Sequence, residues 1–198
     1  ILSGLVGSEM CIRDSGATIL AVNPTGYAQL TISGTSGSRG VLSTPYIFKG
    51  IGTGELQWDG GILQARGNEL EFFPNFSSGE IVIQGGGAFF DTNGYNVGVQ
   101  TPGLLAGTGG FTKLGAGTLT IAGNNSWNGD TTVTAGTLAL GSYTQSGSQT
   151  LTIGVADSTN YGRLQVSGAA TFNNSNLAVN VIGLSLIHIS EPTRPERI

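Results

Sequence analysis

The 198-residue chain is long enough for one domain, or for one stretch of a longer, elongated domain. Charged residues make up 10% of it, against about 25% in typical soluble proteins, and glycine contributes 34 residues. The formal net charge of −4 and the scattered Lys and Arg residues exclude a basic face for nucleic acid. A single cysteine excludes an internal disulfide framework, and no run of about 18 apolar residues predicts a membrane-spanning helix.

The two ends of the chain differ in composition from its middle, because they contain the only Cys, Met and His residues: Met10, Cys11 and His188. Residues 5–15 (LVGSEMCIRDS) and 184–194 (LSLIHISEPTR) resemble translated transposase-type sequencing adapter. One adapter DNA string encodes the second segment on one strand and the first segment on the other. We therefore expect residues 1–15 and 184–198 to be adapter-derived, and residues 16–183 to be a fragment of the protein itself.

Short alternating segments follow one another along residues 16–183. Apolar and polar residues alternate at residues 30–32, 81–83, 118–121, 132–134, 137–140, 151–153, 164–166 and 177–181. This period of two predicts half-buried strands, and the Gly, Asn and Asp clusters between them predict turns. No stretch keeps the 3.6-residue period over the length of a helix, so we predict an all-β chain without substantial helix.

A repeat distinguishes a solenoid from a sandwich or a barrel. Gly117-Thr118-Leu119 returns as Gly136-Thr137-Leu138, and a repeat of about 20 residues, built from short strands and tight turns, is typical of one coil of a β-helix. The sequence therefore predicts a parallel β-helix of roughly eight coils, stacked at the strand spacing of about 4.8 Å.

Residues 109–140 carry the most specific pattern, GGFTKLGAGTLTIAGNNSWNGDTTVTAGTLAL. This segment is similar to the autotransporter-associated β-strand repeat of bacterial autotransporter passenger domains. Trp127 stands where Tyr is usual, and Asp130 stands where a second Gly is usual. Residues 85–107 also look like the coil that often precedes this repeat. The matching positions are Lys113, Gly115, Gly117, Thr118, Leu119, Gly123, Asn124, Gly129, Thr131, Val133, Gly136, Thr137 and Leu138.

The repeat predicts structural roles for its residues. We expect apolar side chains to stack in ladders inside the coil, namely Leu119, Ile121, Val133 and Leu138. We expect glycines at corners that side chains would block, namely Gly115, Gly117, Gly123, Gly129 and Gly136. Asn124 would either bond corner backbone groups or stack in an Asn ladder, and Trp127 or Phe111 would cover a corner.

Catalytic chemistry has little support in the sequence. Residues 16–183 contain no His to activate a nucleophile, and Gly85 to Asp91 misses the spacing of calcium-binding β-roll repeats. Glu69 and Glu71 lie two residues apart, so in a strand they would share a face. Polysaccharide-degrading enzymes also use a pair of neighbouring carboxylates. We favour a solvated strand face, and we predict no catalytic, cofactor-binding or metal-binding residues and no cofactor.

The densest aromatic segment is Phe72-Phe73-Pro74-Asn75-Phe76, with Trp58 as a further aromatic. We interpret it as core stacking with a Pro-bent loop, and the alternative is a loop that contacts a sugar or a host surface.

The resemblance implies a non-enzymatic stalk that is exported to the bacterial cell surface. It also implies a C-terminal outer-membrane β-barrel, absent here, and no membrane insertion of this segment. Host or matrix glycans are further possible partners. Two alternatives stay open: a slice of a β-helical polysaccharide-degrading enzyme, and an adhesin module with residues 72–76 as its contact loop. We also expect isolated residues 16–183 to be poorly soluble, because the ends of a β-helix expose unpaired strand edges.

Overall fold

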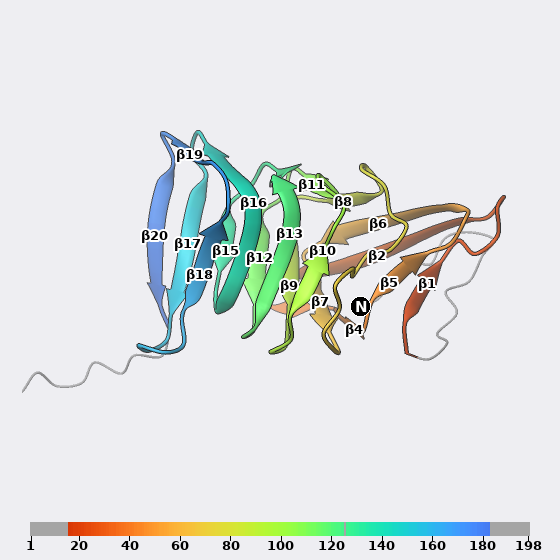
Figure 1. The fold of residues 1–198 in the computed structure, drawn as a ribbon, viewed down its shortest axis with the longest axis horizontal. Coiled ribbons are helices and arrows are strands. Elements are labelled where there is room, and N and C mark those ends of the chain that lie inside the picture. The colour runs from red at the N-terminus through yellow and green to blue at the C-terminus, as the bar shows by residue number, and fades with distance from the viewer. Residues whose placement is uncertain (1–15, 125, 183–198) are drawn as a thin grey trace, which may run out of the picture.

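The computed structural model describes residues 16–124 and 126–182, and these residues form strands and turns without a helix. The strands are stacked one after another along the long axis of the molecule, from β1 at one end to β20 at the other (Figure 1). Nearly all pairings are parallel and join strands of successive coils. The predicted all-β, parallel β-helix is therefore confirmed. The flanks that we expect to be adapter-derived, residues 1–15 and 184–198, lie outside the described residues.

Three sheets wrap around one interior, and successive strands visit them in turn. Sheet I runs β14-β11-β8-β6-β2-β3, with bounds Ser126–Trp127, Leu105–Gly107, Ile81–Ile83, Thr53–Asp59, Tyr27–Thr35 and Ser38–Arg39. Sheet II runs β20-β17-β15-β12-β9-β7-β4, with bounds Asn176–Val181, Thr150–Val155, Thr131–Val133, Phe111–Leu114, Ala88–Asp91, Ile62–Ala65 and Val41–Thr44. Sheet III runs β10-β13-β16-β18, with bounds Val97–Val99, Thr118–Asn124, Gly136–Ser146 and Gly162–Val166.

The remaining strands extend these sheets. The second half of β16 pairs with β19 (Ala170–Asn173). At the other end of the rod, β1 (Thr18–Leu20) pairs with β5 (Ile47–Lys49). Backbone hydrogen bonds from Ile47 to Phe72 and from Phe72 to Gly98 connect β5 to β10 across an irregular segment. Sheet III is therefore continued by residues 69–74, although these form no regular strand.

The number of coils differs from the prediction. Sheet II contains seven strands, which makes about six turns rather than eight. The steps Thr112↔Thr132 and Thr132↔Thr152 keep the spacing of the repeat, whereas the earlier step Ile62↔Phe89 spans a longer piece of chain. The predicted count is wrong because the first coils are longer than the repeat, so the chain completes fewer of them.

The interior is built from the inward half of each alternating strand. Leu119, Ile121, Val133 and Leu138 are between 0% and 2% exposed, as the repeat predicts. Leu119 pairs in register with Leu138, so each apolar side chain lies over its equivalent in the next coil. These ladders bury apolar surface from coil to coil, which is the main favourable term in the stability of a solenoid.

The predicted glycine corners are confirmed by backbone geometry. Gly115, Gly117, Gly123 and Gly136 have positive φ, a region that other residues avoid. At Gly136 a Cβ atom would also come within 2.3 Å of the Gly117 carbonyl oxygen in the preceding coil. Gly129 has no positive φ, but a Cβ there would meet the backbone of Gly109 and Gly110, so this corner also requires glycine.

Asn124 does not stack in an Asn ladder, because its register partner in the next coil is Ser142. Its side-chain oxygen accepts a hydrogen bond from the Ser142 hydroxyl. The contact therefore joins two coils through unlike polar side chains rather than through an Asn ladder.

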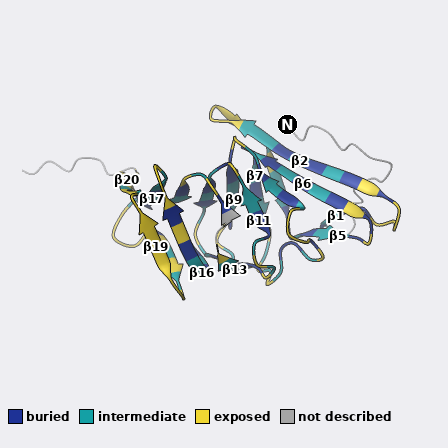
Figure 2. Ribbon diagram, turned by 90° about the horizontal axis from the view of Figure 1, so that it is seen from above, coloured by how far each residue is buried: buried dark blue, intermediate teal, exposed yellow. Residues whose placement is uncertain are grey.

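Burial ends abruptly at the last described coil, which comprises β18, β19 and β20. Figure 2 shows β19 and β20 largely in the colour of exposed residues. Leu177 and Val179 are 71% and 63% exposed, although they continue the inward ladder of Leu151 and Ile153. Inward-facing positions are therefore covered only where another coil lies beyond them.

Candidate functional site

Lys113 is the most unusual residue of the interior. Strand β12 points Phe111 and Lys113 inward, and both side chains are 0% exposed. The Lys113 ammonium donates hydrogen bonds to three backbone carbonyls, those of Leu114 (2.8 Å), Gly115 (2.6 Å) and Ala135 (3.1 Å). An ammonium group has three N–H donors, so every donor has an acceptor. The first two carbonyls belong to its own corner and the third to the next coil.

Burial lowers the pKa of Lys113 from 10.5 to about 8, and the nearby Asp91 carboxylate acts in the opposite direction. A buried amine with a lowered pKa also occurs in lysines that act as nucleophiles or bases. Here the side chain is fully buried and its donors are occupied by the backbone, so the arrangement joins two coils. The sequence identified Lys113 as a repeat residue but missed this role. Its position two residues after inward-facing Phe111 is the signal that could have revealed it.

The aromatic segment lies inside the solenoid. Phe72 and Phe73 are 0% exposed and Phe76 is 4% exposed. The Phe72 ring lies 5.1 Å from the Phe90 ring, which in turn lies 6.1 Å from the fully buried ring of Trp58. The prediction of core stacking is therefore confirmed. The alternative, a loop whose rings contact a sugar or a host surface, is wrong because the rings are buried and inaccessible to a ligand.

Trp127 and Phe111 also lie inside rather than over a corner. Their rings are stacked, with centroids 4.6 Å apart and an interplanar angle of 25°. The Trp127 indole N–H donates to the Thr131 hydroxyl at 2.8 Å, which satisfies the polar atom of this buried side chain. The two residues therefore fill the interior of successive coils.

Glu69 and Glu71 do not share a regular strand. The backbone there is irregular, and Glu69 forms only an isolated β-bridge, with Val97. Glu69 accepts a hydrogen bond from the Glu71 amide, and Glu71 accepts from the amides of Phe73 and Gln100. Both carboxylates are thus occupied by backbone groups that hold this segment. The structure does not gather carboxylates into a cluster: within residues 16–124 and 126–182, no three His, Cys, Asp or Glu residues are placed to hold a metal ion.

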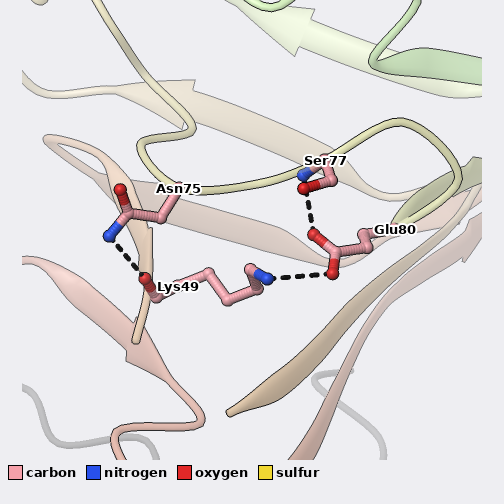
Figure 3. A network of polar contacts seen from close by, with 4 residues as sticks. All are labelled: Lys49, Asn75, Ser77 and Glu80. Carbon is pink, nitrogen blue, oxygen red and sulfur yellow. Dashed lines mark hydrogen bonds and ion pairs between the residues drawn. The ribbon is translucent and has the colours of Figure 1, made fainter. Parts of the chain in front are cut away.

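The loop that follows the aromatic segment is fixed by a polar network (Figure 3). The Lys49 ammonium lies 2.9 Å from a Glu80 carboxylate oxygen, and the other Glu80 oxygen accepts from the Ser77 amide at 2.7 Å. Asn75, which has a φ of 68°, donates its side-chain amide to the Lys49 carbonyl at 3.1 Å. These three contacts fasten residues 75–80 to β5.

A small hollow lies on the outer surface where β17 passes into β18. Its cavity volume is about 180 Å³. The floor comes from two earlier coils and the wall from the loop before β18 and from β18 itself; the lining residues are Ala116, Ala135, Gly136, Thr137, Thr159, Asn160, Tyr161 and Arg163. Sequence reasoning did not single out this group, because its members come from three separate coils.

Comparisons with known proteins agree with the repeat. Residues 111–140 match the family described as Passenger-associated-transport-repeat. Over 141 residues, 69% of this chain, the sequence is 30% identical to the "Adhesin BmaC autotransporter" of Brucella suis biovar 1 (strain 1330). The chain spans 4% of the length of that relative. No solved structure matches the chain.

The chain is a parallel β-solenoid with a passenger-associated transport repeat in its middle coils. The resemblance to autotransporter passenger domains is thereby confirmed. The described residues include no helix that is sufficiently long and apolar to cross a membrane.

Proposed function

We propose that residues 16–183 are a structural, non-enzymatic stalk segment of an autotransporter passenger that is displayed on the bacterial surface. The observation that carries this proposal is the continuity of the inward ladders from coil to coil, as in Leu119 and Leu138. The buried Lys113 ammonium also joins two coils through the Ala135 carbonyl, and the buried Trp127 indole is satisfied within its own coil by Thr131. The interior is therefore devoted to stacking.

Stacking offers a mechanism for export. Folded proteins gain roughly 0.05–0.15 kcal/mol per residue, so a coil of about 20 residues contributes about 1–3 kcal/mol when it docks on its neighbour. A coil that folds only after it has crossed the outer membrane cannot slip back without losing this contribution. Sequential docking would thus favour outward movement of the remaining chain.

The test compares two neighbouring substitutions in the chain, expressed between a signal peptide and an outer-membrane β-barrel. Leu119→Asp places a charge inside the ladder, whereas Thr120→Asp places the same charge on the exposed side of the same strand. We expect Leu119→Asp to slow the appearance of the segment at the cell surface and Thr120→Asp to leave it unchanged. Equal display kinetics for both variants would contradict the proposed role.

The complete protein, in this proposal, continues into a C-terminal outer-membrane β-barrel, and residues 1–15 and 184–198 are adapter-derived rather than native. Long-read sequencing of the source DNA, primed within the codons for residues 113–140, tests both statements. Native codons past Gly183 that lead to a β-barrel would support them. Recovery of the codons for residues 184–194 from genomic DNA would return His188 to the protein and contradict the assignment of the flanks.

A further inference from the structure

The hollow between β17 and β18 owes its existence to an extended coil. On sheet II, the register step from Thr152 to Ala178 spans a longer piece of chain than the preceding step from Thr132 to Thr152. Part of this additional length forms the loop of residues 156–161, whose last three residues form a wall of the hollow. In repeat proteins such extensions occur on the surface and often carry the binding function.

The extended loop is held in one shape by Asp157. One of its carboxylate oxygens accepts hydrogen bonds from the backbone amides of Thr159 (2.7 Å) and Asn160 (2.8 Å) and from the Thr159 hydroxyl (2.7 Å). The other oxygen accepts from the Asn160 side-chain amide at 2.6 Å. Four donors thus converge on one exposed carboxylate. The loop is preorganised, and the negative charge of Asp157 is engaged within it rather than with Arg163.

Arg163 supplies a positive charge on the wall. Its guanidinium donates to the Tyr161 hydroxyl at 2.8 Å and lies 5.3 Å from the centroid of the Tyr161 ring. Within the described part of the chain, this hydroxyl is the acceptor that the structure gives to Arg163. A guanidinium has five N–H donors in a planar fork, so the group retains the capacity for two-point binding of a carboxylate. Both side chains are exposed at the rim.

A second positive charge lies beneath the floor. The carbonyl oxygen of Ala135, a floor residue, accepts a hydrogen bond from the buried Lys113 ammonium at 3.1 Å. The same ammonium bonds the Gly115 carbonyl, next to the floor residue Ala116. The backbone corner at the floor of the hollow therefore has a cation on the side that faces the interior of the solenoid. The protein interior screens this charge less than water would.

We propose that this hollow binds a carboxylated sugar ring, such as a hexuronate unit of an acidic glycan. Arg163 would pair with the carboxylate, the Tyr161 ring would pack on the apolar face of the sugar, and Thr137 and Thr159 would meet its hydroxyl groups. The volume of about 180 Å³ is smaller than the roughly 300–1,000 Å³ of pockets that enclose a drug-sized ligand. The site thus accommodates one sugar ring. Because the hollow is open to the outer surface of the solenoid, the rest of a longer glycan chain can extend away from it. This role goes beyond the proposed stalk.

The experiment titrates the ¹⁵N-labelled full chain with three probes and follows the amide signals of Thr159, Asn160 and Arg163. D-Glucuronate has the ring and the charge, D-glucose has the ring alone, and acetate has the charge alone. We expect glucuronate to bind more tightly than either of the other probes. Equal affinity for glucose would overturn the recognition of a carboxylate, and equal affinity for acetate would overturn the recognition of a sugar.

A matched pair of variants locates the binding. Arg163→Gln removes the proposed anchor and should weaken glucuronate binding by about tenfold or more. Arg66→Gln makes the same change of charge at an exposed position outside the hollow, and should leave the affinity within about twofold. Unchanged binding to Arg163→Gln, or no glucuronate binding by the original chain, would contradict the proposal. Neither result would affect the display test of the stalk, so the two proposals fail independently.

Discussion

The coil of β15 and the coil of β20 show what stabilises this molecule. Both strands belong to sheet II and both place alternate side chains toward the interior. Val133 in β15 is 0% exposed, whereas Val179, which occupies the equivalent position in β20, is 63% exposed. The sequence pattern sets the direction of a side chain in both coils. Burial, and with it stability, comes only from a neighbouring coil on each side.

The largest effect should come from opening the fully covered interior. Phe90→Ala removes a buried ring that contacts Trp58 and Phe72, and it should lower the free energy of unfolding by about 3–5 kcal/mol. Phe172, in the last described coil, is 52% exposed, and Phe172→Ala should cost less than about 1 kcal/mol. Urea unfolding of both variants measures the difference. Equal losses would show that the two regions are packed alike.

An intermediate effect is expected for the buried ammonium. Lys113→Met keeps the bulk of the side chain but leaves the carbonyls of Leu114, Gly115 and Ala135 without their donor. Because the removal of a buried charge offsets part of that loss, we expect a net destabilisation of about 1–2 kcal/mol at pH 7, measured by urea unfolding. A variant as stable as the original chain would contradict a bridging role for the ammonium.

The same residue predicts a dependence on pH. Since the pKa of Lys113 is about 8 in the folded chain and 10.5 when unperturbed, the unfolded chain binds more protons between these values. The original chain should therefore gain stability, by at most about 3 kcal/mol, as the pH rises from 8 to 10.5. Lys113→Met should lack this gain. Parallel pH profiles for the two chains would contradict a buried, charged lysine.

The smallest effect on stability should appear at the exposed end. Replacing Leu177 and Val179 together by Thr preserves strand propensity, and should change the free energy of unfolding by less than about 0.5 kcal/mol. The same change should reduce self-association, because exposed apolar strands at a sheet edge template pairing with other chains. Light scattering of the two chains measures this effect. A large loss of stability would show that these residues are covered in solution.

The sequence predicts the middle coils better than the outer ones, for a physical reason. From Lys113 to Leu140 the period is regular, so the sequence alone places Leu119 and Leu138 in one ladder. Earlier, residues 66–80 have no alternation. They replace a strand of sheet III with an irregular segment, so the repeat overestimates the number of coils. Burial of Phe72 and Phe73 was predictable from apolarity, but their contacts were not.

The candidate site was beyond prediction because it depends on register. Arg163, Thr137 and Ala116 belong to three different coils, and only the stacking of these coils brings them to one corner. The extension at residues 156–161 is visible only when the spacing of partners on sheet II is known. The motif assigns Lys113 to the repeat. Its role in joining two coils depends on an inward-facing side chain, which the polarity of lysine does not predict.

A thiol cross-link between register partners tests the stacking of the coils most directly. In a chain with Cys11→Ser, Thr112→Cys and Thr132→Cys would place two thiols on the outer side of adjacent strands, about 4.8 Å apart along the rod. A parallel, in-register solenoid predicts rapid intramolecular joining of these thiols by a short bifunctional reagent. The control pair Thr112→Cys and Thr171→Cys, which lies on different sheets, should react far more slowly. Equal rates for the two pairs, or no cross-link between positions 112 and 132, would contradict a parallel, in-register solenoid.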